Sequence, residues 1–297
     1  MADVSLDTPA VAATVPGPVA ERRHGPSGTV LRVLLYVSLA LAAFVVLLPV
    51  IWMLFSSVKP EHEILAHPAQ LWPTHVTWTN YSEVFRQIPF LRQFGNTVLF
   101  AGAVTLFSLF FDSMTGYALA RLEFPGKRVL FLAVLVFLML PGQVTLVPIY
   151  QLLSHLHLVN TFPGLIIPRA TNAFGIFFMR QFFLGIPQDM SEAARIDGAG
   201  EFRIYSRIVL PLAMPALLTL GLFHLMFNWN DLLWPLVLTT DTAMQTLPAG
   251  LAMFMGQHVV EYGLLMAGAT MAMVPMLLAF VVVQRRFIEG IATTGLK

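Results

Sequence analysis

Long apolar runs, separated by short polar segments, dominate this chain. A transmembrane helix needs about 20 predominantly apolar residues, and six stretches are long enough. The first of them carries no charged residue from Val33 to Val58. The pattern predicts an all-α, polytopic membrane protein with six transmembrane helices, at residues 31–58, 93–120, 129–153, 161–183, 211–238 and 262–283.

Prolines and glycines interrupt two of these predicted helices. Pro141-Gly142 lies in the third, and Pro163-Gly164 and Pro168 lie in the fourth. Proline has no amide hydrogen to donate, and its ring clashes with the preceding turn. Such breaks are tolerated in a membrane where the backbone lines a protein interior. We therefore expect the third and fourth helices to be kinked or broken.

Composition supports a membrane protein and excludes several kinds of chemistry. The chain is 57% hydrophobic and only 11% charged, whereas a soluble domain carries roughly 25% charged residues. It has no cysteine, which excludes disulfides, thiolate metal sites and cysteine nucleophiles. The histidines show no metal-binding spacing, so we expect no metal site.

The positions of the basic residues predict the orientation, because Lys and Arg are enriched in cytoplasmic loops. Arg169 falls inside a predicted helix, three basic residues fall on one side, and thirteen fall on the other. We therefore expect both termini and the loop before the fifth helix to be cytoplasmic. The thirteen are Arg22, Arg23, Arg32, Arg121, Lys127, Arg128, Arg180, Arg195, Arg203, Arg207, Arg285, Arg286 and Lys297, and the three are Lys59, Arg86 and Arg92.

Two segments outside the helices have their own composition. Residues 1–30 are rich in Ala, Pro, Thr and Val without a regular period, and we expect a disordered cytoplasmic tail followed by a membrane domain at 31–297. Residues 59–92 form an external loop that carries Trp72, Trp78 and Tyr81. Such aromatic residues fit the membrane interface, as a belt or as a lid.

The loop before the fifth helix is charged and helix-forming. Asp189 and Glu192 have the spacing of a capping box, and Gly198 is placed to end a helix of about two turns. A second short helix is expected from Glu201 to about Ile208, and Pro211 suits the first turn of the fifth transmembrane helix. The sequence thus predicts two short helices with a sharp bend between them.

A helix of two turns is unstable alone in water, so the first helix of this loop needs support. Ala193, Ala194 and Ile196 give it a small apolar patch beside Arg195 and Asp197. The patch could occupy a groove on a partner, or the loop could be a connector that only caps its helices.

The loop also carries a sequence motif, Glu-Ala-Ala-x3-Gly-x9-Ile-x-Leu-Pro. It resembles the signature loop of permease subunits in bacterial ABC importers, and the form Glu-Ala-Ala-Arg-Ile-Asp-Gly-Ala is similar to that of the carbohydrate-uptake branch. Residues 227–236 and the tail 284–297 also resemble that branch, although the tail is shorter and lacks the closing glycine common in the family. The motif residues here are Glu192, Ala193, Ala194, Gly198, Ile208, Leu210 and Pro211.

The resemblance implies a type I ABC importer permease fold in the bacterial inner membrane, with a permease domain at 31–297. It implies that the loop at about 186–211 couples to a cytoplasmic ATPase through the motif residues and Asp197. The expected partners are a homologous second permease, an ABC ATPase dimer, an extracytoplasmic solute-binding protein, a sugar and membrane lipid, but no nucleic acid.

No catalytic motif accompanies this loop. Gly126-Lys127 is the only Gly-Lys pair, and it lacks the upstream glycine and the following Ser or Thr of a phosphate-binding loop. The motifs His-Glu-x-x-His, Gly-x-Ser-x-Gly and Gly-x-Gly-x-x-Gly are absent. We therefore expect a non-catalytic subunit without a cofactor, for which a partner hydrolyses ATP.

Polar residues inside the predicted helices are candidates for a solute path, because ionisable groups are costly in a membrane. They could equally form hydrogen bonds between helices or pack against the second permease. For the cluster at 229–231 the structural role is favoured, since the motif is shared across many sugars. The candidates are Asp112, Arg169, His224, Asn228, Trp229, Asn230 and Asp231.

The sequence gives little support to two other classes of membrane protein. An ion-coupled secondary transporter would need repeated broken helices with matching carboxylates, but Asp112 has no counterpart in the second half. A membrane-embedded hydrolase would need catalytic pairs that are missing. The solute stays open among mono-, di- and oligosaccharides and glycerol-3-phosphate.

Overall fold

The computed structural model describes residues 26–256 and 260–294, and this part of the chain is almost entirely helical, with one isolated β-bridge between Met255 and Val260. The predicted helical fold class is confirmed. The elements are α1 (Pro26–Ser57), α2 (Glu61–Ala66), α3 (Thr79–Gln87), α4 (Phe90–Arg121), α5 (Lys127–Met139), α6 (Gly142–His155), α7 (Phe162–Ile166), η1 (Ile167–Arg169), α8 (Ala173–Leu184), α9 (Asp189–Ile196), α10 (Glu201–Ile204), the π-helical turn η2 (Tyr205–Val209), α11 (Leu210–Leu212), α12 (Met214–Trp229), α13 (Leu233–Leu238), α14 (Leu247–Leu251), η3 (Ala252–Phe254) and α15 (Tyr262–Thr294).

The chain divides into two compact units, residues 1–50 and 51–297, with the division inside α1. The first unit contains residues 26–50 of α1 and the second contains the rest of that helix. The helix begins at Pro26, a few residues before the predicted start at residue 31. The predicted tail at 1–30 falls mostly outside the described residues, and its boundary with a membrane domain at 31–297 stays a prediction.

Three helices within the described residues are long and apolar enough to cross a membrane: Val30–Ser57 of α1, all of α4, and Tyr262–Val282 of α15. Two further candidates are pairs of helices with a sharp bend, α5 with α6 (102°) and the segment Glu201–Leu212 with α12 (79°). The described helices thus account for three spans, or five if each bent pair is one span. The number six stays a prediction.

The breaks that the sequence predicts in the third and fourth apolar segments are present. Pro141 lies between α5 and α6, where the 102° bend occurs. The fourth segment consists of α7, η1 and α8, and α8 has only 12 residues. Asn172 caps the first turn of α8 by accepting a hydrogen bond from the Phe174 amide at 2.8 Å. The polar backbone groups between η1 and α8 thereby lie within the fourth apolar segment.

The predicted start of the fifth transmembrane helix at Pro211 is wrong. Pro211 belongs to α11, and α12 begins at Met214 after a 79° bend. Pro215, in the first turn of α12, has no amide hydrogen to donate to the Pro211 carbonyl, so the helical hydrogen-bond ladder cannot continue across the bend. The amide of Ala213 instead bonds the carbonyls of Val209 and Leu210, at 3.0 and 3.1 Å.

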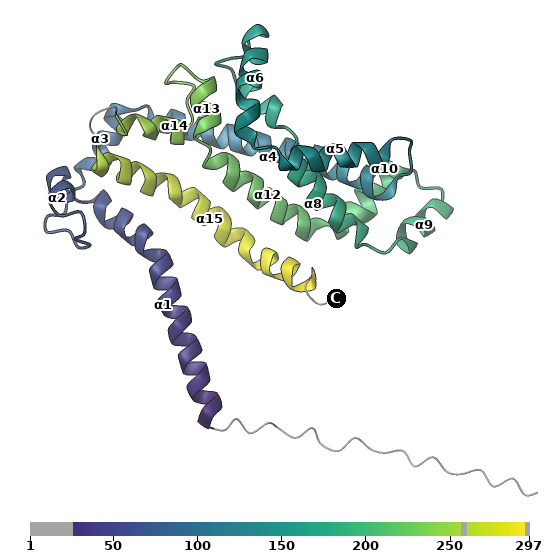
Figure 1. Ribbon diagram of the computed structural model, residues 1–297, viewed down its shortest axis with the longest axis horizontal. Coiled ribbons are helices and arrows are strands. Elements are labelled where there is room, and N and C mark those ends of the chain that lie inside the picture. The colour runs from purple at the N-terminus through teal and green to yellow at the C-terminus, as the bar shows by residue number, and fades with distance from the viewer. Residues whose placement is uncertain (1–25, 257–259, 295–297) are drawn as a thin grey trace, which may run out of the picture. The chain divides into compact units, whose positions relative to one another are not determined.

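Helix α4 is the centre of the second unit, because it contacts α3, α7, α8, α12 and α14. Figure 1 shows α15 lying alongside α12, which it also contacts. One apolar core joins α4, α8, α12 and the segment 204–209 around Tyr117 and Met179. Gly116 brings α4 and α8 close together: a Cβ there would lie 2.9 Å from Met179 Cβ and 3.0 Å from the Arg180 amide nitrogen.

The loop between α1 and α4 is held by two carboxylates. Glu63 accepts hydrogen bonds from the amides of Thr74 (2.7 Å) and His75 (3.2 Å), and the bond from Thr74 is the main cause that lowers the pKa of Glu63. Glu61 accepts from the first two amides of α15 at 3.0 and 2.7 Å. Trp72 and Trp78 of the same loop remain exposed, consistent with a place at the membrane interface.

The contact at Gly116 leads to a prediction about the packing of α4 on α8. Gly116→Ala is expected to destabilise the protein by about 1–3 kcal/mol, because the new methyl group meets backbone atoms that cannot move independently. Gly102→Ala on the same helix is the matched control, since a Cβ there meets nothing within 4 Å. Unfolding of the purified protein in mixed micelles measures both. Equal stability of the two variants would contradict the packing inferred at Gly116.

Candidate functional site

A cavity of about 570 Å³ opens among α4, the bend between α5 and α6, η1, α8, α12 and α13. Its wall combines apolar side chains from α4 and α5 with polar side chains from η1, the start of α8 and α12. The polar or aromatic lining residues are Phe137, Thr145, Arg169, Thr171, Asn172, His224, Phe227, Asn228 and Trp234.

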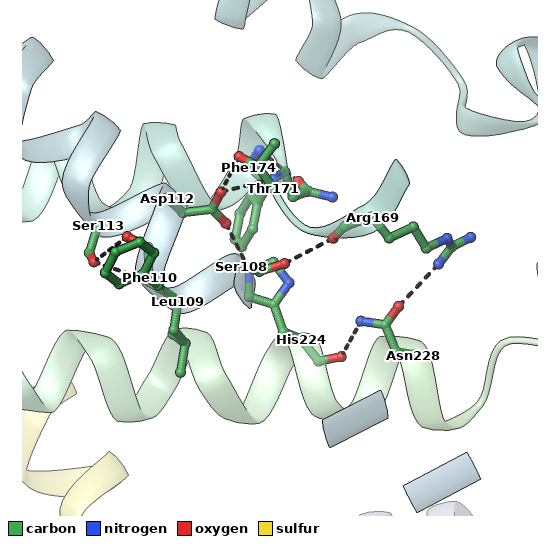
Figure 2. Close-up of polar contacts among 11 residues, drawn as sticks. Ser108, Leu109, Phe110, Asp112, Ser113, Arg169, Thr171, Phe174, His224 and Asn228 are labelled. Carbon is green, nitrogen blue, oxygen red and sulfur yellow. Dashed lines mark hydrogen bonds and ion pairs between the residues drawn. The ribbon is translucent and has the colours of Figure 1, made fainter. Parts of the chain in front are cut away.

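Behind this wall lies Asp112, which is fully buried on α4. One carboxylate oxygen accepts hydrogen bonds from the Thr171 hydroxyl at 2.6 Å and the Asn172 amide at 2.9 Å. The other oxygen lies 3.2 Å from His224 Nε2. Figure 2 shows Asp112 between Thr171 and His224. Because a buried charge needs partners, Asp112 ties α4 to the start of α8 and to α12.

Gly175 makes room for this cluster. A Cβ at Gly175 would overlap Asp112 Oδ2 and would lie 3.0 Å from His224 Nε2. The absence of a side chain at this position of α8 therefore allows the carboxylate and the imidazole to meet.

A second polar cluster is centred on Arg169, at the end of η1. Its Nη2 lies 2.6 Å from Asp231 Oδ2, and its Nη1 donates to Asn228 Oδ1 at 3.2 Å. The guanidinium also lies over the rings of Trp234 (5.1 Å) and Phe227 (5.7 Å). Figure 2 shows Arg169 reaching toward Asn228. The charge of Arg169 at the cavity wall is thus balanced by Asp231.

The predicted path residues divide into three groups. Arg169, His224 and Asn228 line the cavity, whereas Asp112 and Asp231 support it through the bonds just described. Trp229 lies elsewhere, since its indole donates to the Ala272 carbonyl of α15 at 3.1 Å. The exposed Asn230 bonds the carbonyl of Met226 in its own helix at 2.9 Å.

The sequence-based prediction missed Thr171, Asn172 and Trp234. Thr171 and Asn172 precede an apolar run, and an Asn at that place is a common helix N-cap, so a local signal was present. Trp234 had no such signal, because its position depends on the indole donating to the Leu165 carbonyl at 3.0 Å, 69 residues earlier.

The second candidate site is the elbow, by which we mean residues 189–204 with α9 and α10. Gly198 has φ +80°, a left-handed conformation that glycine adopts without strain. The Gly198 amide bonds the Arg195 carbonyl (3.0 Å), and the Ala199 amide bonds the Ala194 carbonyl (2.9 Å). These two bonds form a Schellman motif, so the predicted end of the first helix at Gly198 is confirmed.

The other end of α9 differs from the prediction. The helix begins at Asp189 itself, the N-cap residue is Gln188, and no side chain makes a capping hydrogen bond there. The predicted capping box is therefore wrong. An Asp already inside the first turn still interacts favourably with the helix dipole.

The motif residues and Asp197 divide into an exposed and a half-buried group. Glu192, Ala193, Asp197, Gly198 and Pro211 are exposed. The half-buried residues are Ala194 and Leu210, which pack against the core around Tyr117, and Ile208. Ile196 and Phe202 add large apolar groups to the exposed face, at 87% and 67% exposure.

Glu201 fixes α9 against the rest of the unit, a contact that the sequence did not indicate. One of its oxygens lies 2.7 Å from Arg195 Nε, and the other accepts the Tyr117 hydroxyl of α4 at 2.9 Å. The hydrogen bond to Glu201 raises the pKa of Arg195. Both members of the ion pair are partly exposed, so the pair contributes only about 0.2–1 kcal/mol, and its main effect is on geometry.

No group of three or more His, Asp or Glu side chains that could hold a metal ion is found among residues 26–256 and 260–294.

The sequence of this chain is similar to those of known proteins. Residues 112–292 match the family described as "Binding-protein-dependent transport system inner membrane component". The chain is 36% identical to the arabinooligosaccharides transport system permease protein AraQ of Halalkalibacterium halodurans, over 90% of this chain and 97% of that protein. It is 35% identical to the trehalose transport system permease protein SugB of Mycobacterium tuberculosis, over 84% and 92% of the two chains.

A solved structure has the same fold. It belongs to a bacterial ABC transporter involved in the import of the acidic polysaccharide alginate, and the superposition gives a TM-score of 0.75. The two chains are 24% identical, and the match covers 89% of this chain and 98% of that one.

The balance of charge at Arg169 can be tested by neutralising Asp231. Asp231→Asn keeps an oxygen that can accept the Trp234 amide but leaves Arg169 without a counter-charge. We expect a loss of about 1–3 kcal/mol, below the 3–5 typical of a fully buried pair, because the Arg169 side chain is 24% exposed.

Asp241→Asn is the matched control, since Asp241 also accepts a nearby amide, that of Ala243, but lies in an exposed loop. The added substitution Arg169→Gln should recover part of the loss at Asp231. Thermal unfolding of each purified variant in the same detergent gives the midpoints that are compared. An unchanged midpoint in Asp231→Asn would show that the ion pair is not needed to balance the cavity wall.

Proposed function

We propose that this chain, which belongs to the family of binding-protein-dependent transport system inner membrane components, is the permease subunit of an ATP-driven importer of sugars. In this proposal it pairs with a homologous second permease. An ATPase dimer binds on the cytoplasmic side, and a solute-binding protein delivers the sugar from outside.

The observation that carries the proposal is the elbow. A short helix with an exposed apolar face, ended by a Schellman turn and fixed to α4, is suited to bind in a groove of a partner. Glu192, Ala193, Asp197 and Gly198 would face the ATPase, while Ala194, Ile208 and Leu210 would hold the loop in shape. ATP binding would then move the elbow and, with it, the membrane helices.

The lining of the cavity favours the proposal that the solute is neutral and carries many hydroxyl groups. Its wall offers hydrogen-bonding groups from Thr171, Asn172 and Asn228 beside aromatic rings, and the charge of Arg169 is balanced by Asp231. Such a mixture of polar groups and aromatic surface suits sugar rings. The names of the relatives, which include arabinooligosaccharides and trehalose, point to the same class of solute.

Membership of this family leaves the ion-coupled secondary transporter without support. The family consists of permease subunits of transport systems, which agrees with a subunit that is not itself an enzyme. We infer that the chemistry of ATP hydrolysis belongs to the partner.

The coupling proposal predicts the effect of a side chain at Gly198. Gly198→Val is expected to reduce sugar import at least about tenfold, because a β-branched residue is strongly disfavoured at positive φ. Arabinooligosaccharides and trehalose are the sugars to be tested. Gly200→Val is the control, since Gly200 has φ −72° and a Cβ there meets nothing within 4 Å. Uptake and the amount of protein in the membrane are measured together. Normal uptake by Gly198→Val would rule out the coupling role of this turn.

The orientation can be tested because the chain contains no cysteine. We expect a membrane-impermeant maleimide to label Ile196→Cys only from the cytoplasmic side and Trp72→Cys only from the outside. Both side chains are exposed, at 87% and 67%. Right-side-out and inverted vesicles provide the two conditions. Labelling of both positions from the same side would refute the proposed topology.

A further inference from the structure

We propose that Glu201 is a positioning residue that holds the elbow on α4, and that α4, rather than α12, transmits movement of the elbow to the cavity. The inference rests on the proposed function, since it concerns how the elbow acts on the membrane helices. Four observations carry it.

The first is a pair of hydrogen bonds, which we call the ladder, between α4 and the segment formed by α10 and the following turn η2. The Tyr117 hydroxyl donates to Glu201 at 2.9 Å, and the hydroxyls of Tyr205 and Ser113 lie 2.7 Å apart. Ser113 and Tyr117 are four residues apart, as are Glu201 and Tyr205, so each pair lies on one face of its helix. The two segments therefore pair in antiparallel register.

The second observation is that Glu201 joins both parts of the elbow to this ladder. Its other carboxylate oxygen is occupied by Arg195 of α9. The buried rings of Tyr117 and Tyr205, with centroids 5.2 Å apart, pack between the two bonds. A displacement of α9 would thus reach α4 directly, through Arg195 and Glu201.

The third observation concerns the covalent route, which is poorly suited to transmit force. Between the elbow and α12 the chain passes through the π-helical turn at Tyr205–Val209, then α11, and then the 79° bend. Pro211 and Pro215 remove two amide donors around that bend. Helices commonly bend at such interruptions, so movement of the elbow can be absorbed there before it reaches α12.

The fourth observation is the place where α4 leads. Asp112 directly precedes Ser113 of the ladder and holds Thr171, Asn172 and His224 at the cavity. Figure 2 shows Ser113 and Asp112 together on α4, and the Asp112 side chain points toward Thr171 and His224. Since α4 is one unbroken helix from Phe90 to Arg121, a shift at Tyr117 also shifts Asp112.

The test uses a complex of this chain with its second permease and ATPase, reconstituted in nanodiscs, with all partners free of cysteine. Thr145→Cys in the cavity wall reports access to the cavity by its rate of labelling with a small maleimide. Rates are compared without nucleotide and with ATP and vanadate. This readout needs no knowledge of the sugar.

In the otherwise unchanged chain, nucleotide should alter the labelling rate at least about fivefold, the lower end of typical coupling between sites. Tyr117→Phe, which removes only the hydroxyl, and Glu201→Ala should each abolish most of this response. The double variant should respond like either single variant, because both belong to one contact. Tyr81→Phe is the matched control, since Tyr81 forms a similar hydroxyl pair with Ser57, at 2.8 Å, in the external part of the unit.

The outcomes separate the two proposals. If the unchanged chain shows no response to nucleotide, the proposed coupling function fails. If the labelling rate of the unchanged chain responds to nucleotide, and the rates of Tyr117→Phe and Glu201→Ala respond equally well, the proposed role of α4 is overturned. The proposed coupling function then stands. Independent, multiplying losses in the double variant would also overturn the role of α4. Should Glu201→Ala fail to assemble, as judged by size-exclusion chromatography, Tyr117→Phe, which keeps its aromatic ring, tests the same contact by itself.

Discussion

The carboxylate of Asp112 imposes the strongest constraint on this structure. It is fully buried on α4, a helix long and apolar enough to cross a membrane, and an unpaired charge in such a place is costly. Each hydrogen bond to a charged group contributes about 1.5–3 kcal/mol, and the hydroxyl of Thr171 and the amide of Asn172 supply two of them. The third partner, His224, comes from α12. Satisfying one side chain therefore fixes three segments of the chain relative to one another.

The broken helices follow from the same constraint. An unbroken helix uses its backbone amides internally, so it has none to offer to a buried carboxylate. The interruption between η1 and α8 frees the Asn172 amide for Asp112 and the Arg169 carbonyl for the Ser108 hydroxyl at 3.1 Å. The break between η1 and α8 thus creates polar surface inside the unit, and this surface forms part of the wall of the cavity.

At the other end of α4, the elbow is built from local and distant contacts together. The Schellman turn at Gly198 sets the angle between α9 and α10. Its attachment to the unit depends on Glu201, which bonds Tyr117, and on Ala194 and Ala199, which pack against the core. Because one face is held in this way, the opposite face with Ala193 and Ile196 remains free to contact a partner. A single helix, α4, thereby connects the cavity to the surface proposed to bind the ATPase.

What the sequence by itself determined is what short-range chemistry controls. The apolar runs predicted a helical membrane protein, Pro141 predicted the bend between α5 and α6, and Gly198 predicted the end of α9, because each depends on residues within a turn or two. Local patterns were insufficient for the start of α12 and for the cap of α9, where Pro215 and Gln188 changed the expected boundaries. Only the tertiary structure decided which polar residues line the cavity and which support it, and it alone paired Glu201 with Tyr117, 84 residues apart. The physical reason is that a hydrogen bond between distant segments leaves no periodic trace in either of them.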